Sequence, residues 1–354
     1  MRRSKVAILW HGMPAYAAYL IRSVIEDATI DLHLFATKSP EDPDELERII
    51  GRPIEWVDSR SARAKAERVG ADVWFVTGWA FDECNEFVRV AKSRRSPVVA
   101  MIDNRWRGDL RQRLGSFYFR LALRRSIDFA WVPGKSATRL CRSFGFPPEA
   151  IFDGLYGGDG SIFTLPVAHD REARIGFVGQ LVRRKGFDLL VEAFRQFRRE
   201  FPEYELHAYG AGELARLAVG VPGIVVHQFA KPAVIATAMG TFRTFVMPSR
   251  DDNWPLALHE AALSGCSLVT TQAVGNAEEL VEETNGIVIP AASGEALVAG
   301  LRTVASWPAD RRHLAAIVSR RLAEAFGPAR WRRQFLRLCS TAAPSFSGRS
   351  ATQL

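Results

Sequence analysis

The residues whose types and spacing could perform chemistry gather in the second half of the chain. In the segment IGFVGQLVRRKGFDLL, Gly179 ends an apolar run and is followed by Arg183, Arg184 and Lys185. A glycine at this point allows a tight turn and a close approach of a ligand to the backbone. Positive charge just before a helix suits a phosphate group. For this segment taken alone, the alternative is an ordinary strand-to-helix turn with solvated charges.

A second segment, PSRDDNWPLALHEAALSG, combines carboxylates with the start of a helix. Asn253 is a candidate cap and Pro255 is a favoured residue of a first helical turn. The backbone amides of Leu256 and Ala257 are then expected to face an anion. Glu260 lies one turn further in, where its carboxylate can accept hydrogen bonds from sugar or ribose hydroxyls. Pairing of Glu260 with a nearby arginine is the alternative.

Glycines mark the turns around these segments. Gly265 is expected to close the helix at its C-terminal end. Gly275 and Asn276 stand between the apolar run SLVTT and an acidic helical pattern. This turn is expected to bring backbone amides onto a bound group, and a purely structural turn is the alternative.

Strand and helix patterns alternate along the whole chain. The strand candidates are KVAILW, IDLHLF, PIEWV, DVWFV, PVVAMI and DFAWV in the first half, and ARIGFV, YELHAYG, IVVHQF, TFVMP, SLVTT and GIVIP in the second. Several are continuously apolar, as strands covered on both faces are. The repeat of strand, helix and strand predicts an α/β fold class with parallel, doubly wound sheets.

The chain of 354 residues is long enough for two such domains. The pattern pauses between Tyr156 and Arg174, in a glycine-containing segment that we interpret as the linker. The expected parts are an N-terminal domain over 1–165, a C-terminal domain over 166–325, a last helix over 326–340 that packs back toward the N-terminal domain, and a disordered polar tail over 341–354.

Composition limits the class of protein. The four cysteines are far apart, which argues against a zinc site or a disulfide scaffold and favours buried, reduced thiols in the cytoplasm. The apolar run near the N-terminus is too short for a signal peptide, and no run is long enough to span a bilayer. A net charge of +8 suits phosphate-bearing ligands, anionic membranes or nucleic acid, but no nucleic-acid recognition module is present.

Together these segments resemble the retaining glycosyltransferases of family 4, the group 1 type, over about Gly154 to Leu301. Four motifs follow in the family's order: VGQLVRRKG, the glycines of YGAGE at Gly210 and Gly212, PSRDDNWPLALHEAALSGCSLV with two acids eight positions apart, and AVGNAEELVEETNGIVIP. The resemblance implies the GT-B fold, in which two Rossmann-like domains face a central cleft. It also implies transfer of a sugar from a nucleotide diphosphate donor with retention of configuration and without a metal.

The resemblance also implies roles for individual residues. The first acid of the pair, Asp252, would hold hydroxyls of the donor sugar, and the second, Glu260, would bind the ribose. Lys185 and helix N-termini would hold the diphosphate. The donor-binding residues implied in this way are Gly179, Gln180, Arg184, Lys185, Gly210, Asn253, Trp254, Pro255, Leu256, Ala257, Glu260, Gly275 and Asn276.

Two departures from the family pattern bear on activity. Gln180 replaces the arginine of the motif, so one of two cations on the diphosphate is missing unless Arg183 or Arg184 substitutes for it. The first acid is Asp252 rather than a glutamate, and its side chain is shorter by one methylene. These departures leave open an altered sugar preference or a loss of activity.

The N-terminal half matches the family less well. His11 stands where the family has a glycine-bearing loop after the first strand, and an ordinary loop residue is the alternative. Asp103 and Asn104 stand where many members have a histidine. With Asp252 and Glu260, His11 and Asp103 complete the group that we expect to act in catalysis.

The segment from Arg105 to Arg125 holds seven arginines and one aspartate. Apolar residues recur in it at three- and four-residue steps: Trp106, Leu110, Leu114, Phe117 and Leu121. Such a helix could lie on an anionic bilayer, which would suit an acceptor carried on a lipid. The alternative is a packed apolar stripe beneath a solvated charged face.

We therefore expect a cytoplasmic hexosyltransferase, with a possible peripheral position on the inner face of the cell membrane. Its partners would be a nucleotide-sugar donor and a glycan or polyprenyl-linked acceptor, in bacterial surface polysaccharide or glycolipid synthesis, with no nucleic acid. Two alternatives stay open: a non-catalytic nucleotide-sugar-binding protein that keeps the fold, and a sugar-nucleotide epimerase on the same fold.

Overall fold

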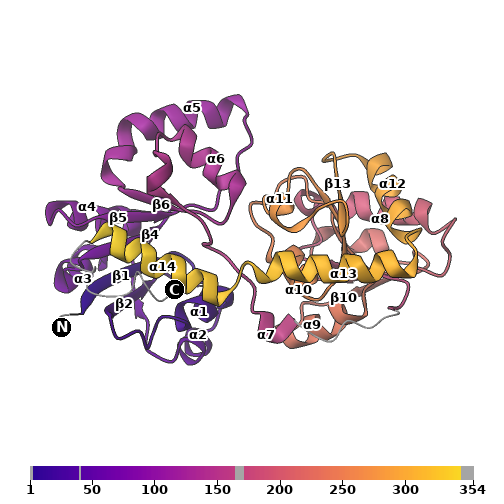
Figure 1. Ribbon diagram of the computed structural model, residues 1–354, viewed down its shortest axis with the longest axis horizontal. Helices are drawn as coiled ribbons and strands as arrows, with labels where there is room; N and C mark the ends of the chain where they lie inside the picture. The colour runs from indigo at the N-terminus through magenta and orange to yellow at the C-terminus, as the bar shows by residue number, and fades with distance from the viewer. Residues whose placement is uncertain (1–2, 40, 164–170, 344–354) are drawn as a thin grey trace. The chain divides into compact units, whose positions relative to one another are not determined.

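A computed structural model describes residues 3–39, 41–163 and 171–343. The chain divides into two compact units (Figure 1). One holds the residues up to Gly157 together with those from Gly327 onward, and the other runs from Gly158 to Phe326. The second unit begins at Gly158, earlier than the expected boundary after residue 165. The backbone N–H of Gly158 already donates to the His259 side chain of that unit, at 2.9 Å.

The first unit is built on a seven-stranded parallel sheet in the order β3-β2-β1-β4-β5-β6-β7. Its strands are β1 (Ser4–Trp10), β2 (Ile30–Ala36), β3 (Glu55–Trp56), β4 (Val73–Thr77), β5 (Val98–Met101), β6 (Phe129–Trp131) and β7 (Ile151–Phe152). The two-residue edge strand β7 is the one that the sequence patterns did not predict. Both faces of the sheet are buried, because alternate residues of β1 belong to two separate cores.

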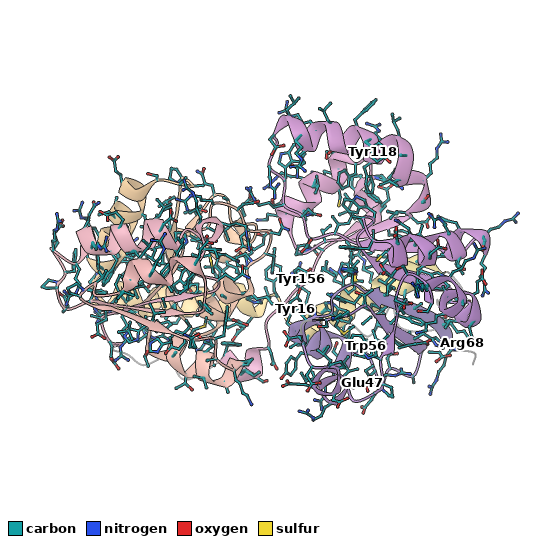
Figure 2. All side chains as sticks on the ribbon, turned by 180° about the vertical axis from the view of Figure 1, so that it is seen from behind. Tyr16, Glu47, Trp56, Arg68, Tyr118 and Tyr156 are labelled. Carbon is teal, nitrogen blue, oxygen red and sulfur yellow. The ribbon has the colours of Figure 1, made fainter. Side chains whose placement is uncertain are left out.

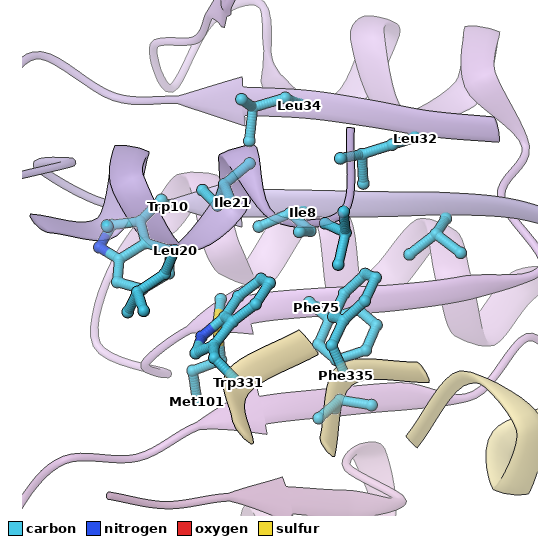
Figure 3. Packing of buried hydrophobic residues seen from close by; sticks show 14 of the residues in the cluster. Ile8, Trp10, Leu20, Ile21, Leu32, Leu34, Phe75, Met101, Trp331 and Phe335 are labelled. Carbon is cyan, nitrogen blue, oxygen red and sulfur yellow. The ribbon is translucent and has the colours of Figure 1, made fainter. Parts of the chain in front are cut away.

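Helices cover both faces of this sheet. They are α1 (Ala15–Arg22), α2 (Pro43–Ile50), α3 (Ala62–Val69), α4 (Asp82–Ser93), α5 (Leu110–Tyr118), α6 (Lys135–Ser143) and α14 (Pro328–Ala342). The last of them packs on the first unit, where Phe335 and Trp331 lie close to Phe75 (Figure 3). Trp331 also contacts the ring of Trp131. The helix continues to Ala342, so the expected tail begins later than residue 341, and its remainder from residue 344 lies outside the described residues.

The second unit has a six-stranded parallel sheet in the order β10-β9-β8-β11-β12-β13. Its strands are β8 (Arg174–Val178), β9 (Glu205–Tyr209), β10 (Ile224–His227), β11 (Thr244–Met247), β12 (Ser267–Thr271) and β13 (Gly286–Ile289). Its helices are α7 (Gly160–Phe163), α8 (Phe187–Phe197), α9 (Pro232–Thr241), α10 (Leu256–Leu263), α11 (Ala277–Leu280), α12 (Gly294–Ala305) and α13 (Ala309–Glu324). Helix α7 falls inside the segment that we had interpreted as a linker.

Both sheets reverse their strand order at one point. The reversal lies between β1 and β4 in the first sheet and between β8 and β11 in the second. In doubly wound sheets, ligands bind beyond the carboxyl ends of the strands at this point. The loops that follow β8 and β11 in the second unit, and β1 and β4 in the first, are therefore where a site is expected.

The cysteines match the expectation of buried thiols. All four are free and buried, and burial raises the pKa of Cys84 to about 12. None of the described helices is both long and apolar enough to cross a membrane.

Candidate functional site

The loops at the carboxyl ends of the second sheet are held together by their backbones. The amide of Gly179, just after β8, donates to the carbonyl of Tyr209 at 3.0 Å. A side chain on Gly210 would lie 1.9 Å from the carbonyl oxygen of Gly179, and one on Gly212 would lie 2.4 Å from that of Leu181. Gly210 and Gly212 are therefore required for this close approach of two backbone segments. From the sequence alone, the same glycines could equally have served the approach of a ligand.

Lys185 and Asp252 form an ion pair at the reversal point of this sheet. Lys185 ends the 3-10 turn η4 (Arg183–Lys185) after β8, and Asp252 follows β11. The lysine Nζ donates to Oδ2 of the aspartate at 2.5 Å, and the two side chains are only 15% and 10% exposed. Ser249 Oγ lies 3.4 Å from the same oxygen. The two residues that were expected to hold different parts of a donor therefore hold each other in the free protein.

A bidentate ion pair fixes the loop after β11 against the start of α8. Both terminal nitrogens of Arg250 donate to Asp188, at 2.6 and 2.8 Å, and the backbone amide of Arg250 donates to the carbonyl of Arg184. The hydrogen bonds with Arg250 lower the pKa of Asp188, although burial of that carboxylate acts in the opposite direction and more strongly than any single bond. This link keeps the lysine and aspartate loops in register.

Gln180 replaces the arginine of the family motif, and the side chains around this position are exposed to solvent. Gln180, Arg183 and Arg184 are all exposed. The guanidinium of Arg184 donates to the carbonyl of Asp251 at 3.0 Å, whereas Arg183 has no ion pair within the described part of the chain. Of the two candidates to replace the missing arginine, Arg183 is therefore the one whose guanidinium group has no hydrogen-bond or ion-pair partner among the described residues.

Helix α10 begins with two available amides. Its N-cap is Pro255, whose side chain cannot cap, so the expected cap at Asn253 is wrong. Within the described residues, no acceptor binds the backbone N–H of Leu256 or Ala257. The helix dipole adds positive potential at this end. This helix start, four residues after Asp252, therefore has two amide donors without a protein acceptor.

The other end of α10 differs slightly from the expectation. Ser264 is the C-cap, and Gly265 follows it with a φ of 75°, the left-handed conformation that glycine favours. Gly265 thus ends the helix from the position after the cap.

The turn after β12 is used to position α10. The amide of Gly275 donates to the carbonyl of Asp252 at 2.9 Å, so this amide is not offered to a ligand. Asn276 is completely buried, and its Nδ2 donates to the carbonyl of Pro255 at 3.0 Å. Its Oδ1 has no partner within the described residues. Gly275 and Asn276 therefore fix the start of α10. This is the structural role that the sequence left as the alternative to ligand binding.

Glu260 is partly buried on the second turn of α10. Burial raises the pKa of its carboxyl group to about 7. The structure shows no ion pair for Glu260 among the residues it describes, so the alternative of an arginine partner is wrong. Its carboxyl group is therefore available as a hydrogen-bonding group and changes charge near neutral pH.

His259, which the sequence analysis did not single out, is a buried structural residue. Its Nδ1 accepts from the Gly158 amide, and its Nε2 donates to the carbonyl of Ala323 at 2.8 Å. Burial lowers the pKa of the imidazole to about 4, so it is neutral at pH 7. It ties the beginning and the end of the second unit to α10, and no local pattern signals this role.

Trp254, expected to bind the donor, is 7% exposed and packs on Phe326 with ring centroids 5.7 Å apart. Its Nε1–H is buried and has no hydrogen-bond partner in the described part of the chain. The residue therefore contributes mainly to packing at the start of α10.

In the first unit, His11 lies at the reversal point of the sheet. Its backbone amide donates to Thr77 Oγ1 at 2.6 Å, and its ring nitrogen Nδ1 lies 3.1 Å from Thr37 Oγ1. The ring stacks on Phe81 at 3.5 Å. The imidazole is thus oriented by contacts on two sides and is only partly buried.

Asp103 belongs to a separate polar cluster after β5. Its Oδ2 accepts from the hydroxyl of Tyr156 at 3.2 Å, and the ring of Tyr156 contacts that of Tyr16 (Figure 2). Burial raises the pKa of Asp103 above its usual range and that of Tyr16 to about 12. The structure therefore places Asp103 and His11 in the same unit, with different partners.

Comparisons with known proteins agree with this architecture. Residues 172–306 match the family model described as Glycosyl transferases group 1. The HepE protein of Anabaena, in complex with UDP and glucose, is similar over 96% of this chain and 100% of its own, at 15% identity and a TM-score of 0.76. A glycosyltransferase from Rickettsia africae is similar over 97% and 99%, at 11% identity and a TM-score of 0.78. The chain has the GT-B fold.

Other GT-B structures extend the comparison. The lipopolysaccharide outer core galactosyltransferase WaaB, in its apo form, is similar over 95% of this chain and 99% of its own, at 13% identity and a TM-score of 0.72. No curated protein matches the chain significantly by sequence. The likeness to these GT-B proteins therefore concerns the fold, and the match to the group 1 family concerns most of the second unit.

Proposed function

We propose that the chain is a retaining glycosyltransferase that moves a hexose from a nucleotide diphosphate sugar to a glycan or lipid-linked acceptor. The reaction would need no metal cofactor and would serve the synthesis of a bacterial surface polysaccharide or glycolipid. The observation that carries the proposal is the Lys185–Asp252 pair beside the free amides of α10, with Glu260 on the same helix.

The chemistry follows from the charges at this point. When the bond between the sugar and the diphosphate breaks, negative charge develops on the leaving nucleotide. The amides of Leu256 and Ala257, together with the Nζ of Lys185, are fixed donors that stabilise such charge. An ammonium group has three donor hydrogens, so Lys185 can keep its bond to Asp252 and still donate to a phosphate oxygen.

The two carboxyl groups would hold the rest of the donor. Oδ1 of Asp252 receives no hydrogen bond from any described residue, and it is therefore available to a sugar hydroxyl. Glu260, when ionised, would accept hydrogen bonds from the ribose. The acceptor would bind at the first unit, where His11 and Asp103 follow strands β1 and β5.

Related structures support the choice of donor and acceptor classes for a first experiment. HepE has been captured with UDP-glucose, and the pneumococcal O-GlcNAc transferase GtfA with UDP and GlcNAc. WaaB is a galactosyltransferase of the lipopolysaccharide outer core. UDP-sugars and bacterial surface glycans are therefore the first compounds to test.

A thermal-shift screen against UDP-, GDP-, ADP- and TDP-sugars tests donor binding. A donor present at about 100 times its dissociation constant should stabilise the fold by about 2.7 kcal/mol. Release of the nucleotide diphosphate is then measured with and without acceptors. Release that depends on an acceptor supports the transferase, binding without transfer supports a non-catalytic protein, and conversion of the sugar nucleotide alone supports an epimerase. Absence of any donor binding would contradict the proposal.

A further inference from the structure

The arginine-rich helix of the first unit packs through its polar side. In α5, Ser116 is buried, and its hydroxyl lies 2.8 Å from that of Ser143 on α6. Gln112, one turn earlier, accepts from the backbone amides of Arg107 and Gly108 and donates to the carbonyl of Arg105. The helix is thus anchored by hydrogen bonds on the side that an ordinary amphipathic helix exposes.

The apolar side of the same helix consequently faces outward. Leu110, Leu114, Phe117, Tyr118 and Leu121 are each between 64% and 72% exposed. Figure 2 labels Tyr118 on this outer helix. We call these five residues the apolar stripe. The alternative of a packed stripe beneath a charged face is therefore wrong for Leu110, Leu114, Phe117 and Leu121. It holds only for Trp106, which is partly buried and packs against the core.

Exposed cations flank the apolar stripe. Arg111, Arg113, Arg120 and Arg125 are exposed and have no ion pair in the described part of the chain. The single acid of the segment, Asp109, is the N-cap of α5 and accepts from the backbone of Gln112. The surface thus combines apolar side chains with uncompensated positive charge.

Other arginines of the segment are part of the fold. Arg124 donates to the backbone carbonyls of Gly145 and Ile127, and its guanidinium lies 4.1 Å from the ring centroid of Phe146. A cavity of about 440 Å³ is lined partly by residues of this segment, among them Arg105, Arg107, Asp109 and Arg111.

We infer that the apolar stripe inserts into the surface of an anionic lipid bilayer, with the four free arginines on the headgroups. Amphipathic helices with leucine and aromatic residues beside basic ones lie in this way in the plane of a membrane. A second copy of the chain is disfavoured as the occupant, because it would bring the same arginines face to face. The inference goes beyond the proposed function and holds whether or not the chain transfers a sugar.

Insertion makes a prediction that adsorption by charge alone does not make. Charges at a surface are screened by salt, whereas buried apolar area is not. The wild-type protein should therefore bind vesicles that contain 30% phosphatidylglycerol, on the order of tenfold more tightly than neutral phosphatidylcholine vesicles, and should keep part of that binding in concentrated salt.

Co-sedimentation of the full chain with these vesicles separates the two contributions. The double variant Leu114→Gln/Phe117→Gln should lose binding by about tenfold or more at every salt concentration. The quadruple variant Arg111→Gln/Arg113→Gln/Arg120→Gln/Arg125→Gln should lose the preference for anionic vesicles. A matched control, Leu314→Gln/Ile317→Gln, changes two apolar residues that are each 50% exposed on α13 and should bind like the wild type.

Insertion itself can be read from a single labelled site. Because the four native cysteines are buried, a cysteine introduced as Phe117→Cys can be labelled selectively with an environment-sensitive fluorophore. Its emission should shift to the blue with anionic vesicles, and that of labelled Leu314→Cys should not. Thermal unfolding confirms that each variant is folded. The inference is overturned if wild-type protein stays in the supernatant with anionic vesicles, if the Leu114/Phe117 variant binds equally well, or if sedimentation velocity shows that the stripe instead joins two copies.

Discussion

Lys185 and Asp252, 67 positions apart in the chain, form an ion pair across the point where the strand order of the second sheet reverses. The pair is largely shielded from solvent, so neither charge is fully hydrated. A diphosphate that binds here meets a lysine already engaged by a carboxylate. Replacing each partner on its own therefore tests the effect of each charge on nucleotide binding.

Replacing Lys185 with alanine should weaken the binding of a nucleotide diphosphate and of its sugar by about tenfold or more. The reason is the loss of a charge-assisted hydrogen bond, which contributes about 1.5–3 kcal/mol. Isothermal calorimetry with the nucleotide, the nucleotide sugar and the free nucleoside checks this. The nucleoside should bind as before, and an equal loss for it would indicate a folding defect instead.

The variant Asp252→Asn should act in the opposite direction on the free nucleotide. Removing a negative charge beside Lys185 should tighten nucleotide diphosphate binding by about threefold to tenfold, which corresponds to about 0.6–1.4 kcal/mol. Transfer from the nucleotide sugar should fall, because the carboxylate is no longer available to the sugar. Weaker nucleotide binding, measured in the same titrations, would contradict this use of Lys185.

Glu260 should make donor binding depend on pH. Its pKa of about 7 means that the charged acceptor for ribose hydroxyls is lost as the pH falls below 7. Donor affinity should therefore fall by about tenfold between pH 8 and pH 6, since hydrogen bonds to charged groups are the stronger ones. In Glu260→Gln this dependence should be absent, and calorimetry at four pH values measures it.

Glu260 should also lower the free energy of unfolding of the ligand-free protein at high pH. Because its folded pKa lies above the unfolded value of 4.5, the folded state binds the proton more tightly, and the stability that this contributes disappears as the pH rises from 4.5 through 7. Glu260→Gln should thus raise the free energy of unfolding at pH 8 by about 1–3 kcal/mol. Urea unfolding without ligand tests this, and no gain at pH 8 would show that the carboxyl group is not desolvated.

His259, the neighbour of Glu260, should contribute stability that is lost at low pH, whereas the contribution of Glu260 is lost at high pH. Its folded pKa of about 4 lies below the unfolded value of 6.5, so its contribution is complete above pH 6.5 and is lost as the pH falls toward 4. His259→Phe should remove this contribution and leave the Gly158 amide and the Ala323 carbonyl unpaired. We expect a loss of about 1–3 kcal/mol per unpaired group at pH 7, measured by urea unfolding. Unchanged stability at pH 7 would contradict the role of His259 as a link.

Restoring the family residue with Gln180→Arg tests whether the exposed loop after β8 still faces the diphosphate. A second cation there should tighten nucleotide diphosphate binding by about threefold to tenfold and leave nucleoside binding unchanged. Gln196→Arg, on the exposed side of α8, is the matched control and should have no effect. If both variants behave alike, residue 180 does not reach the ligand.

Much of the architecture follows from the sequence alone. Apolar, β-branched runs predicted every strand except β7, and their alternation with helical patterns predicted two parallel, doubly wound sheets. The resemblance of the ordered glycine and acid motifs to those of family 4 implied the GT-B fold. These patterns are local, because the burial of a strand on both faces or the turn at a glycine is recorded in a few consecutive residues. They also located the loops of the second unit in which Lys185 and Asp252 lie.

Tertiary structure decided what local patterns leave open. The periodicity of α5 indicates a two-sided helix but does not say which side packs. The hydrogen bonds of Gln112 and Ser116 turn the polar side inward and leave the apolar stripe exposed. The ion pair of Lys185 and the link made by His259 depend in the same way on partners far along the chain. Such contacts arise only when the strand order brings distant loops to one edge of a sheet, and for that reason no short segment records them.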